Sequence, residues 1–200
     1  MKPPTSRARG RLVAPILALA VAAAAFAGAS ASMAPANAAT DACSNLTSAL
    51  HRTVNPDRLN FAGVQLLSSS AAEIANSAKY GFTAPGTDLG WVSPTPQTSL
   101  VGVHRLHQAT TGVFTWSADL TDIATMVSAG WIDQKISFYA ATAADTCTVK
   151  AERFTKSGSY RTVTAEAEKA TLKSKGWATV PTGAFHVKSN VSAPPPDTKF

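Results

Sequence analysis

The chain has 200 residues, 45% of them hydrophobic, with 18 Lys and Arg against 12 Asp and Glu, and its length suits one domain. Four of the basic residues and none of the acidic ones lie in residues 1–38, so the rest of the chain carries a net charge of only +2. This near balance excludes the clustered basic surface of a nucleic-acid-binding protein. We therefore expect no nucleic acid among its partners.

Residues 1–38 have the pattern of a secretory signal peptide. Four basic residues precede an apolar run over 12–29, and Ala36-Asn37-Ala38 gives the small–x–small pattern that signal peptidase cleaves. A cut after Ala31 fits the same pattern, and an uncleaved membrane anchor is a further alternative, because about 18 apolar residues can span a bilayer. We predict cleavage after Ala38, a secreted, extracellular protein and no membrane contact after cleavage.

Cys43 and Cys147 are the only cysteines of the chain. In an oxidising compartment two cysteines allow one intramolecular disulfide, and closing a loop of about 100 residues stabilises a fold by roughly 4–5 kcal/mol in the chain-entropy model. The alternative, a metal or redox site, favours closer spacing such as C-x-x-C. We predict the disulfide, no metal site and no cofactor.

A repeated order of features divides the remaining chain into three parts, at about 50–93, 101–141 and 149–188. One such unit cannot bury its own apolar face, so three should pack around a shared core. We predict an α+β domain over 39–188, built from three strand–strand–helix–strand repeats in a compact, pseudo-threefold and monomeric arrangement. An arginine marks the first strand of each part, at spacings of 53 and 48 residues: Arg52, Arg105 and Arg153.

The predicted strands are short, β-branched or aromatic, and bounded by turn residues. Residues 189–200, with three consecutive prolines, are predicted to form a disordered tail. In chain order the expected strands are 50–53, 63–67 and 89–92 in the first part, 101–106, 113–116 and 136–140 in the second, and 151–154, 159–163 and 183–187 in the third.

Each part has helix-capping residues between its second and third strands. Ser70 followed by Glu73 predicts a capping box, and Ser117 and Thr164 are the predicted N-caps of the other two helices. A glycine followed by an aromatic residue ends each helix, which is typical of a left-handed C′ position: Gly81, Gly130 and Gly176.

This pattern resembles DUF5648, a family of extracellular bacterial repeats of unknown function. The family's His-Phe-Tyr-Thr motif lacks its histidine in the second and third parts, so nothing that depends on that histidine is carried over. Family members often occur attached to secreted hydrolases, and the resemblance implies an accessory or surface-binding role rather than catalysis. The matching residues are Arg105, Leu106, Gly112, Phe114, Thr115, Asp122, Gly130, Trp131, Phe138 and Tyr139, then Arg153, Phe154, Gly158, Tyr160, Glu168, Gly176, Trp177 and Phe185.

The three repeated arginines are the clearest polar candidates. Each part also has an acid early in its helix, so Arg–carboxylate pairs, made bidentate by the guanidinium fork, would hold the units together. The alternative is that all three arginines converge on an anionic ligand. The acids are Glu73, Asp122 and Glu168.

Trp116 lies within a predicted strand, where it would either pack in the core or face outward and stack on a sugar ring. Core packing explains the other tryptophans, Trp91, Trp131 and Trp177. The four histidines are dispersed, and we expect no metal between them.

Three functions fit these observations. A non-catalytic binding module for a glycan or a cell-surface protein leads, with Trp116, Arg52, Arg105 and Arg153 as its candidate ligand-binding residues. A structural or interaction protein of the cell envelope comes second. A secreted hydrolase comes third, because the sequence contains no recognisable catalytic motif and we expect no catalytic residues.

Overall fold

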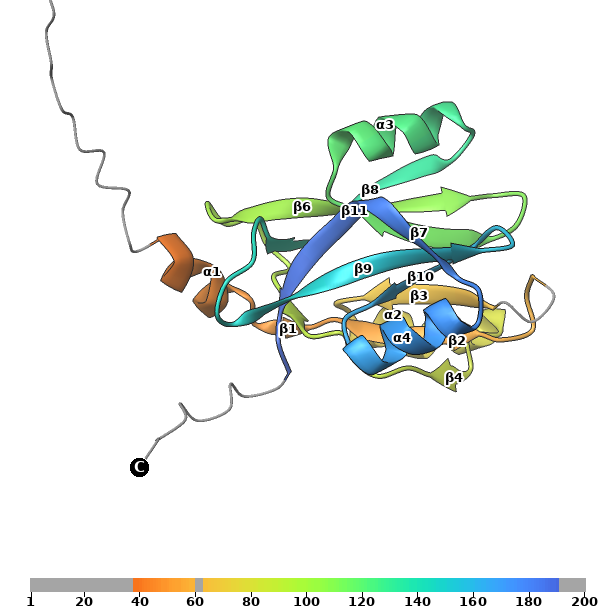
Figure 1. The fold of residues 1–200 in the computed structure, drawn as a ribbon, viewed down its shortest axis with the longest axis horizontal. Coiled ribbons are helices and arrows are strands. Elements are labelled where there is room, and N and C mark those ends of the chain that lie inside the picture. Colours follow the sequence, from red (N-terminus) through yellow and green to blue (C-terminus); the bar gives the residue numbers. More distant parts are fainter. Residues whose placement is uncertain (1–37, 60–62, 191–200) are drawn as a thin grey trace, which may run out of the picture. The chain divides into compact units, whose positions relative to one another are not determined.

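The computed structural model describes residues 38–59 and 63–190. Residues 1–37 of the predicted signal peptide (1–38) and residues 191–200 of the predicted tail (189–200) lie outside the described residues. Within the described part, no helix is long and apolar enough to cross a bilayer. The elements in chain order (Figure 1) are α1 Ala38–Asn45, β1 Ser48–Ala49, β2 His51–Asn55, β3 Val64–Ser68, α2 Ala71–Ser77, the 3₁₀ helix η1 Ala78–Tyr80, β4 Ala84–Pro85, β5 Trp91–Val92, β6 Leu100–Gln108, β7 Val113–Ser117, α3 Leu120–Ser128, β8 Ile132–Ala141, β9 Thr148–Lys156, β10 Ser159–Val163, α4 Glu166–Ser174 and β11 Ala178–Lys188.

The strands form two sheets. The larger has eight strands, in the order β1-β5-β11-β8-β6-β7, with β9 and β10 joined to it through β11. The smaller has the order β3-β2-β4. The fold is therefore α+β and mostly β, which confirms the predicted class.

Three segments of the chain share one order of elements: segment 1 (48–92), segment 2 (100–141) and segment 3 (148–188). Each contains an antiparallel hairpin followed by a helix, the hairpins being β2–β3, β6–β7 and β9–β10. A further strand then pairs with the first strand of the hairpin: β8 with β6, and β11 with β9. In segment 1 this strand is divided, because β4 pairs with β2 while β5 pairs with β1 and β11.

The core lies where the second strands of the hairpins meet. Each of β3, β7 and β10 contacts the other two, and all five residues of β3 are buried. The buried Gln65 of β3 joins this strand to β10, since its Nε2 donates to the Thr162 carbonyl at 3.0 Å and its Oε1 accepts from the Thr162 N–H at 2.7 Å. The side-chain amide satisfies backbone groups that would otherwise be buried without partners.

The helix N-termini differ in part from prediction. Ser70 caps α2 as expected, by accepting from the Glu73 N–H at 3.3 Å. The predicted caps Ser117 and Thr164 are wrong, because α3 is capped by Asp119 and α4 begins after Ala165, which makes no side-chain capping bond. Ser117 lies two residues too early, and its hydroxyl accepts from the Asp119 N–H instead.

The predicted helix C-termini are confirmed. Gly81, Gly130 and Gly176 have φ angles of +83°, +89° and +78°, which glycine adopts without steric cost. The aromatic residue after each glycine donates its N–H to a carbonyl five residues back, on Ser77, Met126 or Leu172, the bond of a Schellman motif.

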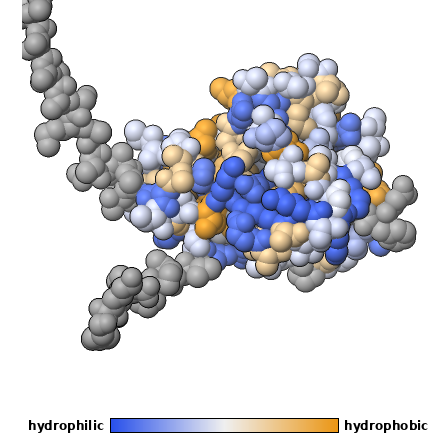
Figure 2. All heavy atoms as spheres, viewed as in Figure 1, coloured by the Kyte–Doolittle hydropathy of each residue, from blue (hydrophilic) through white to orange (hydrophobic). Residues whose placement is uncertain are grey.

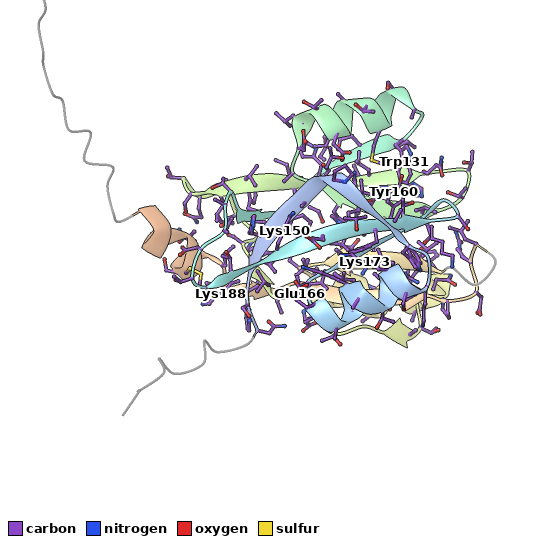
Figure 3. All side chains as sticks on the ribbon, viewed as in Figure 1. Trp131, Lys150, Tyr160, Glu166, Lys173 and Lys188 are labelled. Carbon is purple, nitrogen blue, oxygen red and sulfur yellow. A yellow bond between two sulfur atoms is a disulfide. The ribbon has the colours of Figure 1, made fainter. Side chains whose placement is uncertain are left out.

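These three aromatic residues, Phe82, Trp131 and Trp177, are buried. Figure 3 shows Trp131 beside Tyr160 of β10, with ring centroids 5.5 Å apart in an edge-to-face arrangement. Trp91, which we also expected in the core, is exposed, because it lies on the short β5 rather than after a helix.

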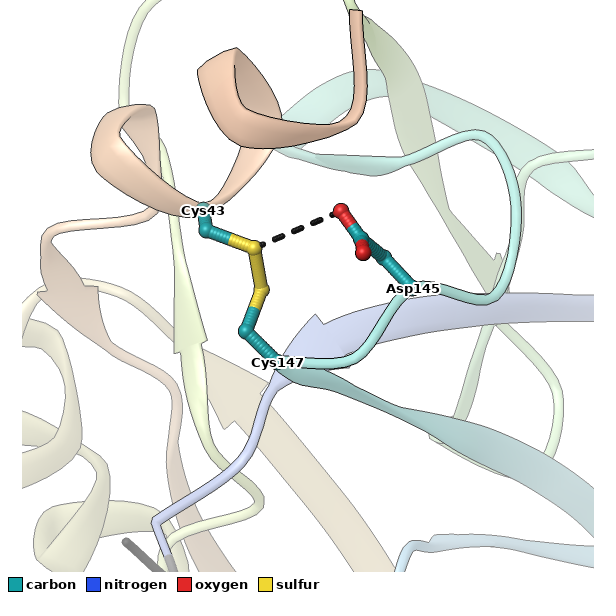
Figure 4. Close-up of side chains that lie close together, drawn as sticks. All are labelled: Cys43, Asp145 and Cys147. Carbon is teal, nitrogen blue, oxygen red and sulfur yellow. Dashed lines mark hydrogen bonds between the residues drawn. A yellow bond between two sulfur atoms is a disulfide. The ribbon is translucent and has the colours of Figure 1, made fainter. Parts of the chain in front are cut away.

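The predicted disulfide is present between Cys43 of α1 and Cys147, just before β9 (Figure 4). It joins positions 104 residues apart. The Asp145 carboxylate lies beside it, with Oδ2 3.5 Å from the Cys43 Sγ. The bond therefore fastens the first described helix to the start of segment 3.

Candidate functional site

Each repeated arginine forms an ion pair with the helix acid of another segment. Arg105 of segment 2 contacts Glu73 of segment 1 at 2.5 Å, and Arg153 of segment 3 contacts Asp122 of segment 2 at 2.6 Å. Arg52 of segment 1 contacts Glu168 of segment 3 at 2.7 Å. Each contact uses one terminal guanidinium nitrogen, so the pairs are not the bidentate forks that we predicted. The arginines do not converge on one ligand but connect the segments in pairs.

The Arg153–Asp122 pair is sealed inside the protein, with side chains 3% and 9% exposed. Thr182 of β11 donates to the Asp122 carboxylate at 2.8 Å, and the next residue, Gly183, approaches so closely that a Cβ there would lie 3.0 Å from the Arg153 guanidinium carbon. Burial would raise the pKa of Asp122, but hydrogen bonds from Arg153, Ser117 and Thr182 outweigh it and lower the pKa. A ligand has no access to Arg153, which is therefore wrong as a binding residue.

The Arg52–Glu168 pair is intermediate, with side chains 9% and 35% exposed. It borders a cavity of about 240 Å³ that also includes Asp88 and Asn190. Arg161 lies nearby, and burial together with the charge of Arg52 lowers its pKa to about 10. Little of the Arg52 side chain reaches the surface at this junction.

The Arg105–Glu73 pair is the most open, with side chains 23% and 39% exposed. It borders a cavity of about 390 Å³, which we name the Arg105 cavity. This volume lies within the range of about 300–1,000 Å³ typical of small-molecule sites. Its lining comes from segments 1 and 2: Arg58, Leu66, Glu73, Asn76, Ser77, Tyr80, Phe82, Arg105, His107, Gly112, Phe114 and Gln134.

Aromatic rings form much of the wall of the Arg105 cavity. His107 stacks on Phe114 with ring centroids 4.6 Å apart, and Phe82 lies 6.4 Å from Phe114. Tyr80, at the end of η1, is 71% exposed. Its carbonyl accepts from the Asn55 Nδ2 at 2.9 Å, which fixes the backbone at this position.

Glu73 uses both carboxylate oxygens within the protein. Oε1 accepts from Arg105 and Oε2 accepts from the Ser68 hydroxyl at 2.6 Å. Burial would raise the pKa of Glu73, but these two hydrogen bonds and the charge of Arg105 lower it. The carboxylate is therefore ionised at neutral pH, and it offsets the charge of Arg105.

Trp116 lies in the core. Its side chain is 1% exposed, so the hypothesis of a surface tryptophan that stacks on a sugar is wrong. The hairpin registers explain its position, because Trp116 is opposite Arg105 just as Leu67 is opposite Arg52 and Thr162 is opposite Arg153. All of these partners are buried, and aligning the segments by their arginines would have indicated this from sequence.

Sequence reasoning missed Arg58 and Tyr80. Both lie in parts of segment 1 without an obvious counterpart in the other two segments. The available signal for Tyr80 was its place directly before the helix-ending Gly81. The residues before the other two helix-ending glycines, Gly130 and Gly176, are not aromatic but Ala129 and Lys175.

Two histidines each contact an aspartate. The Nδ1 atoms of His51 and His104 lie 3.1 and 3.0 Å from carboxylate oxygens of Asp88 and Asp133. Among the described residues, the one group of potential metal ligands is Cys43, Asp145 and Cys147, and its two sulfur atoms already form the disulfide (Figure 4).

The face shown in Figure 2 is hydrophilic over β9 and α4. Charges there are paired: Glu152 contacts Lys150 at 3.4 Å and Lys169 at 3.5 Å, and Lys169 also contacts Glu166 at 2.7 Å. Figure 3 shows Lys150, Glu166 and Lys173 on this same face. Two acids and two lysines on this face therefore offset each other.

Comparison with models of protein families assigns the chain to a family. The model of the family described as a domain of unknown function, DUF5648, matches residues 38–186. The chain belongs to the DUF5648 family. Neither the curated proteins nor the solved structures gave a match, so the DUF5648 assignment carries no named activity.

Proposed function

We propose that this DUF5648 protein is a secreted, non-catalytic binding module that holds a surface glycan in the Arg105 cavity. The cavity carries the proposal. It is open, it is lined by aromatic and polar side chains from two segments, and such a combination is typical of a small-molecule site.

Secretion rests on the N-terminal pattern and on the disulfide. Basic residues, an apolar run and a small–x–small site precede residue 39. Cys43 and Cys147 form a disulfide, and disulfides are stable in oxidising compartments and rare in reducing ones.

We further propose that segments 1, 2 and 3 are copies of one unit in a pseudo-threefold, monomeric ring. The ion pairs support this, because they run from segment 2 to 1, from 3 to 2 and from 1 to 3. The mutual contacts of β3, β7 and β10 also support it. The ring then has three equivalent junctions, of which the Arg105 cavity is the widest.

Tyr80 replaces Trp116 as the proposed stacking residue. An exposed tyrosine presents a flat apolar face and a polar hydroxyl, which suits a sugar ring. Phe82, Phe114 and His107 lie behind it in the wall. η1 and the Asn55 contact fix the backbone from which the Tyr80 ring projects.

The test is a glycan array and a cell-wall pulldown with residues 39–200, comparing Tyr80→Ala with Leu120→Ala. Both residues are exposed large side chains, at 71% and 73%, but Leu120 begins α3 and does not line the cavity. The proposal expects binding that Tyr80→Ala abolishes and Leu120→Ala preserves. Binding to no glycan and no wall fraction would refute it.

A structural or interaction protein of the envelope is the second candidate. Four exposed aliphatic side chains on α3 and β8 favour it: Leu120, Val127, Ile132 and Ile136. In the same pulldown, retention that is lost with Leu120→Ala and kept with Tyr80→Ala would select this candidate instead.

A further inference from the structure

The Arg105 cavity contains one cation more than it contains anions. Arg105 and Glu73 offset each other at 2.5 Å. The Arg58 side chain forms no ion pair with any acid in the described part of the chain, and within that part its guanidinium donates to the Thr111 carbonyl at 3.4 Å. The cavity therefore has an unneutralised guanidinium on its wall.

Arg58 is held where a ligand can reach it. The residue is exposed, and its guanidinium lies against Gly112, where any Cβ would clash with it. The absence of a side chain at position 112 leaves room for the Arg58 fork beside the β6–β7 turn.

The charges of Arg58 and Arg105 reach the same part of the cavity. Burial and these two charges lower the pKa of His107, so its ring is neutral at pH 7 and adds no charge of its own. An anionic group beside Arg58 would meet a guanidinium that has no acid partner among the described residues, and such a group suits a carboxylate.

We infer that the Arg105 cavity recognises an acidic sugar, in which a carboxylate on the pyranose ring contacts Arg58 while the ring stacks on Tyr80. This inference rests on the proposed function, and it names the ligand class of the same site. A neutral sugar would leave Arg58 without a counter-charge. A free carboxylate would leave the aromatic wall uncovered.

The test measures binding of uronic-acid oligosaccharides by titration calorimetry. Galacturonate, glucuronate and mannuronate trisaccharides are each compared with the carboxyl-reduced neutral sugar of the same linkage, and sodium acetate is titrated alone. At least one acidic trisaccharide should bind about tenfold more tightly than its neutral counterpart, which is the effect of one charge-assisted hydrogen bond. This preference should weaken as NaCl is raised, since the site is open to solvent.

The variants are Arg58→Gln, Arg58→Lys and the control Lys79→Gln. Lys79 is exposed beside Tyr80 but does not line the cavity, so its loss changes the net charge equally. We expect Arg58→Gln to lose about tenfold in affinity for the acidic sugar, Arg58→Lys to lose less because it keeps the charge but not the guanidinium fork, and Lys79→Gln to have no effect. Equal losses of affinity in Arg58→Gln and Lys79→Gln would mean that Arg58 acts only through the net charge of the protein, and this result would overturn the inference.

The remaining outcomes separate the two proposals. Equal binding of acidic and neutral sugars, or acetate that binds as tightly as a trisaccharide, overturns the acidic-sugar inference and leaves the glycan module standing. Binding to no sugar here and to no fraction of the array overturns both.

Discussion

The three ion pairs differ in burial, so removing their arginines should destabilise the fold by graded amounts. Replacing Arg153 by methionine leaves Asp122 charged, 9% exposed and without its cation. Breaking a buried pair from one side costs about 3–5 kcal/mol. The same change at Arg105 should cost only about 0.2–1 kcal/mol, because both partners are partly exposed and water solvates the remaining Glu73. Arg52 should fall between them.

The assay is urea unfolding of residues 39–200 with the disulfide intact, followed by tryptophan fluorescence. A double variant, Arg153→Met with Asp122→Asn, is the control. It removes the unpaired charge while the amide oxygen still accepts from Thr182, so it should be more stable than Arg153→Met alone. Equal losses for Arg153→Met and Arg105→Met, or a loss below about 1 kcal/mol for Arg153→Met, would refute the idea that burial determines the strength of these junctions.

Three further measurements test other features. The pKa values of His107 and His186 are lowered from 6.5, so the unfolded chain takes up protons first, and the free energy of unfolding should fall as the pH drops below about 6.5. It should fall again below about 4.5, because Glu73 and Asp122 have lowered pKa values in the fold and the same acids protonate first in the unfolded chain. In a series of urea titrations, His107→Gln should reduce only the first step. Cys43→Ser should cost about 4–5 kcal/mol, since the bond closes a separation of 104 residues, and unchanged unfolding after reduction would contradict this. Gly183→Ala should be more destabilising than Gly130→Ala in thermal unfolding, because both have positive φ but only the first would place its Cβ against the Arg153–Asp122 pair, while Gly130 has nothing within 4 Å.

Local chemistry predicted the secondary structure well. The predicted strand 159–163 is β10, and the glycines that end the helices behave as expected because a left-handed residue is a strong local requirement. The predictions were wrong where a side chain had two possible hydrogen-bond partners. Glu73 does not reach back to the Ser70 N–H as a capping box would have it, because Arg105 and Ser68 take both of its oxygens.

The candidate site was harder to predict than the fold. The sequence indicated that the repeated arginines meet acids, but it contained no information on which junction stays open. That depends on tertiary contacts, such as the hydrogen bond between Arg153 and Thr182 and the close approach of Gly183 to the Arg153 guanidinium. The inward direction of Trp116 reflects the packing of β7 against β3 and β10, and it is the one of these features that aligning the segments by their arginines could have indicated.

The contact of Arg52 with Glu168 joins positions 116 residues apart. A ribosome makes the chain from its N-terminus, so β2 emerges long before the helix that carries its partner. Until α4 is made, the first hairpin has an unpaired arginine and an uncovered edge, and contacts of such long sequence separation form slowly. A nascent chain that ends before residue 164 would contain Arg52 without its partner Glu168. The Arg52–Glu168 contact can therefore form only after the chain of segment 3 has been made as far as α4.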